Sequence, residues 1–452
     1  MALVKQRMMP LDFRPLMPTR GRMTPAARIA AAIEVLADIE TRRRPAGDAL
    51  KDWGLKHRFA GSKDRSAIGT VIYDALRVRA SAAWIMGEDS ARAIVLGALR
   101  RARGMDVEAI AALCGAGPHA PEALTEQETA RLTAADLTGA PDHVQGDYPE
   151  WLAPSFAATF GDHAVAEGKA LSARAPVDLR VNTLRTDREK ALKALSHFSP
   201  VTTPYSPWGL RVAVAPDGRG PALAAEPSYV KGLVEVQDEA SQLVALLTGA
   251  KPGWQVLDLC AGAGGKTLAL AAMMDNKGQV FATDTDGRRL MPIFDRLERS
   301  GARNVQVRAP KGAKPVLTDL EGRCDLVLVD APCTGTGTWR RNPDAKWRTR
   351  PGALEQRLRE QKEILAEAAT YVKPGGRLVY VTCSLLREEN EDQVSAFLAA
   401  TDGFLPLDAA HAAKAAGVEA LGQFASKFGP GLRLSPATSN TDGFYTAIML
   451  RS

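Results

Sequence analysis

The feature that most constrains the fold of this chain is the apolar run Leu326–Val329, which lies between Asp325 and Asp330. A short, continuous apolar run of this kind is typical of a parallel strand that is buried on both faces of its sheet. The run leads at once into Asp330-Ala-Pro-Cys333-Thr-Gly-Thr-Gly. Because ligands of open α/β sheets bind beyond the carboxyl ends of the strands, we expect the chemistry of this protein at that loop.

A second apolar run, Gly376–Val381, leads into Thr382-Cys383-Ser384 and so also ends at a cysteine. Strands and helices alternate from Gln237 onward, which is typical of a doubly wound α/β sheet. The sequence therefore predicts a Rossmann-like domain over residues 236–452. Its predicted strands are Gln255–Leu259, Gln279–Asp284, Asn304–Arg308, Asp325–Asp330, Gly376–Val381 and Gly443–Leu450.

The chain before residue 236 has a different pattern. Thr24 is a suitable N-cap and Pro25 suits a first helical turn, after which apolar residues recur at helical spacing. Further helices are predicted over Arg65–Ala80, Ser90–Arg101 and Val107–Leu113, and strand signals begin only near residue 176. We therefore predict a flexible basic tail (1–20), an all-helical domain (21–145) and a small α+β subdomain (146–235), with the turn-rich segment 139–150 as a linker.

The predicted strand at Val256–Cys260 runs into a glycine-rich turn and then into a helix, an arrangement that exposes backbone N–H groups to a ligand. A P-loop would need glycine where Cys260 stands, and a dinucleotide fingerprint would need glycine where Thr267 stands. S-adenosylmethionine fits better, because Asp284 ends the next strand and can bind the ribose hydroxyls, with Asp286 as an alternative in the following turn. The predicted cofactor-binding residues are Cys260, Ala261, Gly262, Ala263, Gly264, Gly265, Lys266, Asp284, Arg289 and Asp330.

Two cysteines beside such a cofactor loop favour covalent methylation of a pyrimidine. A thiolate that adds to carbon 6 of cytosine makes carbon 5 nucleophilic toward a sulfonium methyl group, which splits one hard step into two. Asp330 is placed to bind the nitrogen 3 and amino side of the base. The residues alone leave open whether Cys333 or Cys383 is the nucleophile.

Several segments resemble the Nop/Sun family of RNA cytosine-5 methyltransferases over about residues 170–452: LDLCAGAGGKT, VDAPCTGTGTWRRNPDAKWR, VTCSLLREENEDQV and TDGFYTAIML. Residues Thr24–Leu113 are similar, more loosely, to the NusB-like RNA-binding domain of the ribosomal-RNA members. The resemblance implies a class I S-adenosylmethionine-dependent methyltransferase sheet, with Cys383 as the nucleophile and Cys333 assisting release of the product.

The chain departs from the family pattern at two positions. Ala263 stands where the family loop usually has proline, so we expect a slightly looser loop that keeps its backbone donors. The stretch Val307–Lys314 lacks the aspartate that the family usually places near adenine. The sequence therefore leaves open how adenine is held.

Between the two cysteines, basic residues alternate with two tryptophans, a combination that suits phosphates and stacked bases of single-stranded or loop RNA. The alternative is a basic loop that packs its tryptophans into the fold. Since the stretch follows the Pro-Cys loop directly, we predict that it borders the pocket. The predicted RNA-binding residues are Lys266, Trp339, Arg340, Arg341, Lys346 and Arg348.

The composition of the chain limits the classes of molecule that it is expected to bind. The net charge of +6 and the pI near 9.0 favour a polyanion. Five cysteines without a CxxC pair, together with six histidines, make a zinc site improbable. No apolar run approaches the length of a membrane helix. We therefore expect a cytoplasmic monomer, without metal or membrane partner, that methylates cytosine in ribosomal RNA. The alternatives are a tRNA or DNA cytosine-5 methyltransferase and a non-catalytic RNA-binding ribosome assembly factor.

Overall fold

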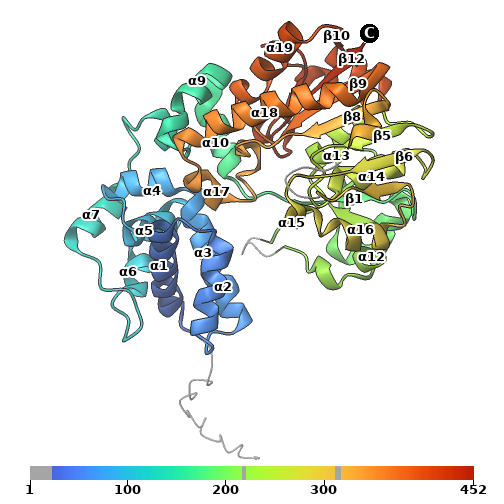
Figure 1. Cartoon of the computed structure of the whole chain (residues 1–452). Coiled ribbons are helices and arrows are strands. Elements are labelled where there is room, and N and C mark those ends of the chain that lie inside the picture. Colours follow the sequence, from blue (N-terminus) through green and yellow to red (C-terminus); the bar gives the residue numbers. More distant parts are fainter. Residues whose placement is uncertain (1–22, 216–219, 311–316) are drawn as a thin grey trace, which may run out of the picture.

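The computed structural model describes residues 23–215, 220–310 and 317–452 (Figure 1). The predicted tail lies outside this part of the chain. The structure begins with a helical region, as the sequence predicts, and α1 starts where expected, because the Thr24 hydroxyl accepts the Ala27 N–H at 3.1 Å. Its helices are α1 (Pro25–Arg42), α2 (Ala46–Lys56), α3 (Ser62–Arg77), α4 (Arg79–Met86), α5 (Ala91–Arg101), α6 (Val107–Leu113) and α7 (Glu126–Ala134).

The helical region has a core of its own, formed by the apolar faces of α1, α3 and α5. The faces recur at the spacing that brings residues three and four apart onto one side of a helix. Helix α1, for example, buries Val35, Leu36 and Ile39, and α5 buries an almost continuous run from Ala93 to Leu99. The helical region therefore folds around side chains that the periodic pattern identifies.

The segment 139–150, which its turn-forming residues predict to be a linker, contains the short helix α8 (Asp142–Gln145), and residues 146–149 are buried. The Asp147 carboxylate accepts hydrogen bonds from both the backbone N–H and the hydroxyl of Ser81, each at 2.8 Å. The Tyr148 ring stacks on Phe156 with ring centroids 4.2 Å apart. The turn-forming residues of this segment therefore pack against neighbouring parts of the chain. The local sequence alone does not distinguish such a packed segment from a solvated loop.

A small antiparallel sheet follows in the strand order β2-β3-β1-β4. It comprises β1 (Val177–Val181), β2 (Val201–Thr202), β3 (Gly209–Val212) and β4 (Val234–Val236), and is preceded by α9 (Ala153–Phe160) and α10 (Ala164–Ser172). Helices α11 (Arg188–Ala194) and α12 (Pro227–Val230) complete this part. The small sheet lies against helices of the large domain, since the Asn182 amide after β1 donates to the Ser300 carbonyl at 2.7 Å.

The large sheet is mixed, with the strand order β10-β12-β9-β8-β5-β6-β7, and β11 pairs with β12. Strands β5 to β9 run parallel, whereas β12 is antiparallel to β9, β10 and β11. The chain order reverses between β5 and β8, which is where open α/β sheets bind ligands. The strands are β5 (Gln255–Asp258), β6 (Gln279–Ala282), β7 (Val305–Val307), β8 (Cys324–Asp330), β9 (Val372–Thr382), β10 (Phe404–Pro406), β11 (Leu432–Leu434) and β12 (Phe444–Arg451).

Helices cover both faces of this sheet, as the apolar run in β8 predicts. Leu326 and Leu328 point into a cluster with α13 (Glu239–Leu247) and α14 (Gly265–Met273). Val327 and Val329 point into the opposite cluster with α18 (Pro351–Tyr371) and α19 (Glu391–Ala400). The remaining helices of this domain are α15 (Gly287–Leu290), α16 (Ile293–Ser300), α17 (Pro343–Arg348), α20 (Ala409–Ala415) and α21 (Pro436–Ser439).

Helix α17 connects the large domain to the helical region (Figure 1). The Lys346 ammonium is buried and donates to the Arg77 carbonyl at 3.1 Å and to the Ser172 hydroxyl at 2.9 Å. The neighbouring Trp347 indole donates to the Leu76 carbonyl at 2.6 Å. One short helix thus holds three parts of the chain together. Because burial disfavours the charged form, the pKa of Lys346 is lowered to about 7.

This lowered pKa predicts a pH-dependent stability. Above pH 7 the folded protein binds fewer protons at Lys346 than the unfolded chain, so the free energy of unfolding should rise between about pH 7 and pH 10, by up to about 1.4 kcal/mol per pH unit. Urea unfolding under reducing conditions measures this rise. We expect Lys346→Met to lose it and Lys277→Met, at an exposed lysine, to keep it. Equal pH profiles for wild type and Lys346→Met would contradict a neutral buried lysine.

Candidate active site

The structure brings the two predicted cysteines together. Strands β8 and β9 pair in parallel, with Asp330 opposite Val381, so their following loops leave the sheet side by side. The Sγ atoms of Cys333 and Cys383 lie 3.3 Å apart, and both side chains are partly exposed. The predicted meeting of these residues at one edge of the sheet follows directly from the strand pairing.

The loop after Cys333 is held against the loop after Cys383 by backbone contacts. The Gly337 N–H donates to the Cys383 carbonyl at 2.9 Å, and the Gly443 N–H donates to the Gly337 carbonyl at 2.8 Å. A Cβ atom at Gly337 would lie 2.1 Å from the Gly443 carbonyl oxygen. Only glycine permits this approach, which explains the second glycine of Thr-Gly-Thr-Gly.

Two adjacent residues that sequence reasoning did not single out fix the two cysteine loops. The Glu389 carboxylate accepts the backbone N–H of Thr334 at 2.8 Å as well as its hydroxyl, next to Cys333. Asn390 accepts the Thr382 hydroxyl and donates to the Ser384 carbonyl at 3.0 Å, on either side of Cys383. The signal was present in the sequence as Arg-Glu-Glu-Asn shortly after the Thr-Cys-Ser strand end, but its role depends on tertiary contacts.

Glu389 is fully buried, and burial raises its pKa. The Gln361 amide donates to this carboxylate at 3.0 Å and to the Pro332 carbonyl at 2.9 Å, which extends the network to the other side of Cys333. A buried carboxylate is tolerated when such donors surround it. Glu389 therefore acts as the anchor of the Pro-Cys loop.

The surroundings of Cys333 keep its thiol protonated. The pKa of Cys333 is raised well above its usual value, first by its hydrogen bond with Cys383, then by burial and by the nearby charges of Glu389 and Asp330. Cys333 is therefore a neutral thiol at pH 7 and can donate its S–H to the Cys383 sulfur. This arrangement suits a protonated Cys333 beside a nucleophilic Cys383.

Asp330 ends β8 and forms an ion pair with Lys266, whose Nζ lies 2.7 Å from the Asp330 carboxylate. Lys266 stands in the first turn of α14, is almost fully buried and lies 4.9 Å from the centre of the Phe444 ring. Asp330 is about one third exposed. The pair thus presents a carboxylate and an ammonium beside the cysteines, where both could contact the polar edge of a base.

The predicted cofactor loop, Ala261–Gly265, is built on backbone contacts. Gly264 adopts φ +80°, and a Cβ atom there would lie 2.4 Å from the Ile293 side chain. The Gly262 N–H donates to the Asp284 carboxylate at 3.0 Å, and Arg289 lies 3.8 Å from the same group. These contacts place Gly262 of the loop, and Arg289, next to the predicted ribose acid.

Two arginines from outside the loop also hold it, and sequence reasoning missed both. Arg296 of α16 donates to the Ala263 carbonyl at 2.9 Å. Arg180 of β1 donates to the Gly265 carbonyl at 2.6 Å. The position where the family usually has proline is therefore braced by a side chain, which compensates for the freer backbone of Ala263.

The residues present fit S-adenosylmethionine. Beneath the loop, Asp258 accepts the Thr267 hydroxyl at 2.7 Å, and its other carboxylate oxygen is buried without a partner in the described part of the chain. Burial raises the pKa of Asp258 to about 7. Asp258 at the end of β5 and Asp284 just after β6, beside the glycine-rich loop, suit a ligand with an amino group and ribose hydroxyls. Of the stretch expected to lack the adenine-side aspartate, residues 311–314 lie outside the described residues.

Four of the six predicted RNA-contacting residues are buried, and for three of them, which have interior partners away from the cysteines, the structure does not support direct contact with RNA. Trp339 is 1% exposed and stacks on Phe156. Arg340 is 3% exposed and pairs with Asp238 and Asp442, and Lys346 is buried in α17 as described above. A basic, tryptophan-rich stretch has the same composition whether it binds phosphates or joins domains. Arg341 and Arg348 keep about a third of their side chains exposed.

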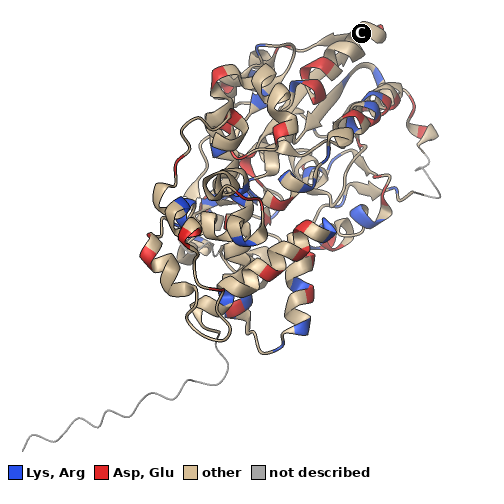
Figure 2. Cartoon of the chain, turned by 90° about the vertical axis from the view of Figure 1, so that its left-hand side faces the viewer, with Lys and Arg blue, Asp and Glu red and all other residues tan. Residues whose placement is uncertain are grey.

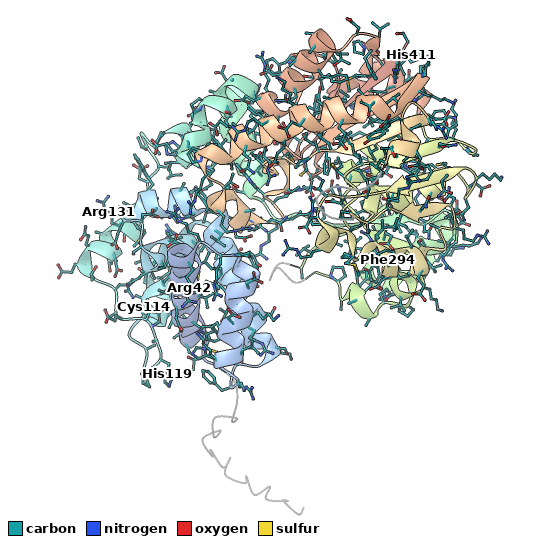
Figure 3. The ribbon with its side chains drawn as sticks, viewed as in Figure 1. Arg42, Cys114, His119, Arg131, Phe294 and His411 are labelled. Carbon is teal, nitrogen blue, oxygen red and sulfur yellow. The ribbon has the colours of Figure 1, made fainter. Side chains whose placement is uncertain are left out.

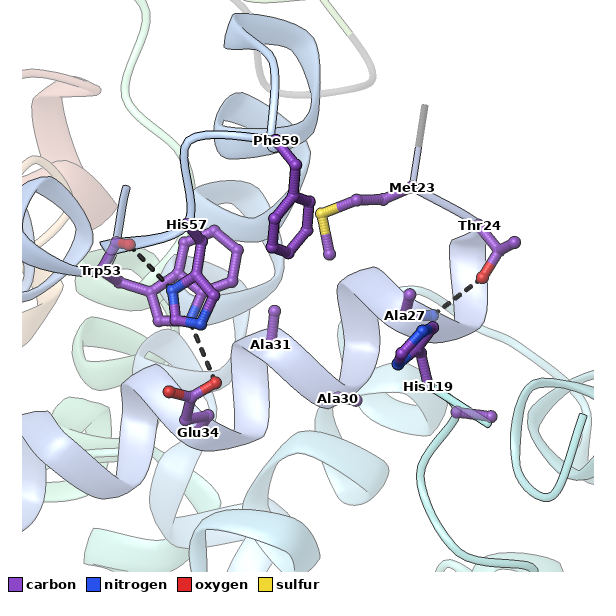
Figure 4. A pocket seen from close by; sticks show the side chains of 11 residues that line it. Met23, Thr24, Ala27, Ala30, Ala31, Glu34, Trp53, His57, Phe59 and His119 are labelled. Atoms are coloured by element: carbon purple, nitrogen blue, oxygen red, sulfur yellow. Dashed lines mark hydrogen bonds between the residues drawn. The ribbon is translucent and has the colours of Figure 1, made fainter. Parts of the chain in front are cut away.

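A cavity of about 690 Å³ lies elsewhere, in the helical region (Figure 4). The rings of Trp53 and His57 stack there with centroids 4.3 Å apart, and the Trp53 indole donates to Glu34 at 3.0 Å. Met23 and Phe59 also line it. This cavity contains neither a cysteine nor a glycine-rich loop, so the candidate active site is the one at the carboxyl edge of the sheet.

Within the described residues, no cluster of histidine, cysteine and acidic side chains is suited to hold a metal ion. The helices of the same residues are too short or too polar to cross a membrane.

The strand order, the glycine-rich loop after β5 and the acid that follows β6 define a Rossmann-like methyltransferase, as predicted. Comparison with known proteins then identifies the family. Residues 245–450 match the family described as 16S rRNA methyltransferase RsmB/F, and residues 148–217 match the ferredoxin-like domain of the same proteins. The chain therefore belongs to the RsmB/F family, which confirms the resemblance found in the sequence.

The names of curated relatives agree with this family assignment. A ribosomal RNA small subunit methyltransferase B from Klebsiella pneumoniae is 34% identical over 67% of this chain and 66% of its own length. A probable ribosomal RNA small subunit methyltransferase B from Synechocystis is 35% identical over 56% of this chain and 57% of its own length. The chain thus spans less than two thirds of the length of these relatives.

Solved structures support the whole architecture. The crystal structure of PH0851 has a TM-score of 0.68 and 25% identity, and the match covers 95% of this chain and 99% of that one. The structure of NSun6 from Pyrococcus horikoshii with SFG has a TM-score of 0.57 and 23% identity over 67% of this chain and 98% of that one. The second likeness shows the fold alone.

The network around Glu389 predicts how a substitution there should act. Glu389→Ala leaves the donors of Thr334 and Gln361 unpaired and should lower the free energy of unfolding by about 2–4 kcal/mol. The loosened loop should also let iodoacetamide label Cys333 about tenfold faster, as expected for a local opening made easier by about 1.4 kcal/mol. Urea unfolding and mass spectrometry of the labelled peptide measure the two effects.

Glu363→Ala, at an exposed position of α18, is the matched control and should change neither quantity. Glu389→Gln keeps an acceptor for Thr334 and should lie between the control and the alanine variant. Unchanged Cys333 labelling in Glu389→Ala would show that the loop is held by other contacts.

Proposed function

We propose that this protein transfers a methyl group from S-adenosylmethionine to carbon 5 of a cytosine in ribosomal RNA through a covalent adduct with Cys383. The observation that carries the proposal is the 3.3 Å approach of Cys333 and Cys383 beside Asp330 and the cofactor loop. Membership of the RsmB/F family and the names of the relatives support this reaction and this class of RNA.

The first step assigned to the residues is nucleophilic attack. The Cys383 thiolate adds to carbon 6 of the cytosine, a carbon–sulfur bond forms, and electron density moves to carbon 5. Asp330 and Lys266 bind the nitrogen 3 and amino side of the ring and hold it over the sulfur. S-adenosylmethionine supplies the methyl group that carbon 5 takes up.

The second step is release. Carbon 5 loses its proton to a base, the electrons of that bond restore the ring double bond, and the Cys383 sulfur leaves. Cys333 is suited to this step, because its Sγ lies 3.3 Å from that of Cys383 and therefore next to the adduct. Its S–H proton passes to solvent first, and the resulting thiolate takes up the carbon-5 proton, which restores the Cys333 thiol as the Cys383 thiolate leaves.

The other parts of the chain are assigned roles consistent with this reaction. We assign the helical domain, residues 21–145, to RNA binding and the subdomain, residues 146–235, to holding the cofactor loop through Arg180. Catalysis is assigned to residues 236–452. A cytoplasmic monomer acting on single-stranded or loop RNA remains the expected form. Methylation of tRNA or DNA and a non-catalytic role in ribosome assembly are the alternatives that the experiment below must exclude.

Substitution of each cysteine distinguishes the roles. Cys333→Ala should form the adduct but release it slowly, so that RNA remains linked to protein on a denaturing gel after incubation with unmethylated ribosomal RNA and labelled S-adenosylmethionine. Cys383→Ala should form no adduct and lose methylation by at least about 10³-fold, as expected when a covalent nucleophile is removed. Parallel incubations with tRNA and DNA test the substrate class.

Cys114→Ala is the control, because Cys114 lies in the helical region, apart from the cysteine pair (Figure 3). An adduct in Cys383→Ala instead of Cys333→Ala would exchange the two roles. The absence of label from every nucleic acid would favour the assembly factor.

A further inference from the structure

A cleft of about 280 Å³ lies where the helical region, the segment after α10 and the segment before α17 meet. It draws residues from all three, and no carboxylate lines it within the described residues. The lining residues are Thr70, Tyr73, Arg77, Arg174, Ala175, Val214, Arg340 and Arg341. Four arginines thus surround a small space, whereas the ribbon in Figure 2 carries basic and acidic residues interspersed along the helices of the face it presents.

The carboxylates that pair with these arginines are not among the residues that line the cleft. Arg340 and Arg341 share Asp238 and Asp442, and this pairing fixes both guanidinium groups in the wall. Arg174 pairs with Asp74, which also pairs with Arg103 at 3.0 Å. The carboxylates therefore orient the arginines without lining the cleft itself.

Of the four arginines in the cleft, Arg77 has the fewest partners that compensate its charge. Its guanidinium donates to the Ala173 carbonyl at 2.8 Å, no ion pair with a carboxylate is formed by it in the described part of the chain, and its Nε is buried without a partner. Burial and the nearby charge of Arg174 lower the pKa of Arg77 to about 10. Two like charges are thus held close together, an arrangement that an anion in the cleft would stabilise.

We propose that this cleft binds a phosphate of the RNA strand whose cytosine enters the active site. Arginine is the side chain best suited to phosphate oxygens, because its planar donors match them in pairs. Arg174 and Arg341, each about one third exposed, provide the accessible charges, and Tyr73 lies beside them. The inference rests on the proposed function for the identity of the anion as RNA.

The position of the cleft along the chain agrees with this role. Arg340 and Arg341 follow the turn η6 (Thr336–Thr338), and Gly337 in that turn donates to the Cys383 carbonyl. The cleft is thus linked to the Cys383 loop through a few residues of chain, and we assign the phosphate to the strand of the target base on this ground. Since Arg77 comes from α3, the cleft also gives the helical region a direct contact with the RNA next to the active site.

The test compares arginine variants in the full-length protein. Arg174→Ser should weaken binding of a single-stranded RNA oligonucleotide about 3- to 10-fold at low salt, measured by fluorescence anisotropy. It should also reduce the slope of log Kd against log salt by about 0.7–0.9, the value of one lost phosphate contact. Arg174→Lys keeps the charge and should keep the slope.

Arg303→Ser is the matched control, because it removes an exposed arginine just before β7, at the amino ends of the parallel strands and thus opposite the cysteines. It should bind RNA with the wild-type slope. Inorganic phosphate, added at constant ionic strength, should compete with RNA in wild type and not in Arg174→Ser if the cleft takes free anions as well. Competition absent from both would restrict the cleft to phosphodiesters of a bound strand.

An unchanged salt slope in Arg174→Ser with wild-type thermal stability would overturn the inference. The outcome is separable from the proposed function. If wild type methylates no RNA while Arg174→Ser still lowers the salt slope, the phosphate site stands without the reaction. If Arg174→Ser methylates saturating RNA at the wild-type kcat with a raised KM, the proposed methyltransferase function and the proposed phosphate site are both supported.

Discussion

The parallel hydrogen bonding of β8 to β9 is the constraint on which the candidate site depends. It places the ends of these strands side by side, so Cys333 and Cys383 meet although fifty positions separate them in the sequence. Strand pairing alone does not fix the sulfur atoms. The close approach of Gly337 to Gly443, together with the buried carboxylate of Glu389, converts two neighbouring loops into one rigid pair.

Buried charge is used in this protein mainly to join parts of the chain. Lys346 ties α17 to the helical region, Arg340 ties the loop after η6 to α13 and to the residues before β12, and Arg180 ties the small sheet to the cofactor loop. Such groups are costly to desolvate, and each is accommodated by several acceptors. Two of the basic residues in the stretch between the cysteines, Arg340 and Lys346, therefore have structural roles.

Much of the fold could be read from the sequence. The apolar runs at Leu326–Val329 and Gly376–Val381 identified buried parallel strands, and the turn at Ala261–Gly265 with Asp284 predicted the class of cofactor that the family uses. Two features of the packing were not evident from the sequence. Segment 139–150 has the residues of a loop but is packed, and Trp339 has the setting of a base-stacking residue but lies in the interior.

The sequence by itself determined which segments form strands and helices and which side chains end the strands, because hydrophobic periodicity and turn chemistry act over a few neighbouring residues. Only the tertiary structure decided the roles of Glu389, Asn390, Arg296 and the arginines of the cleft. Their function depends on partners from distant parts of the chain, and a charged side chain has the same local signature whether it faces water, a carbonyl group or a nucleic acid.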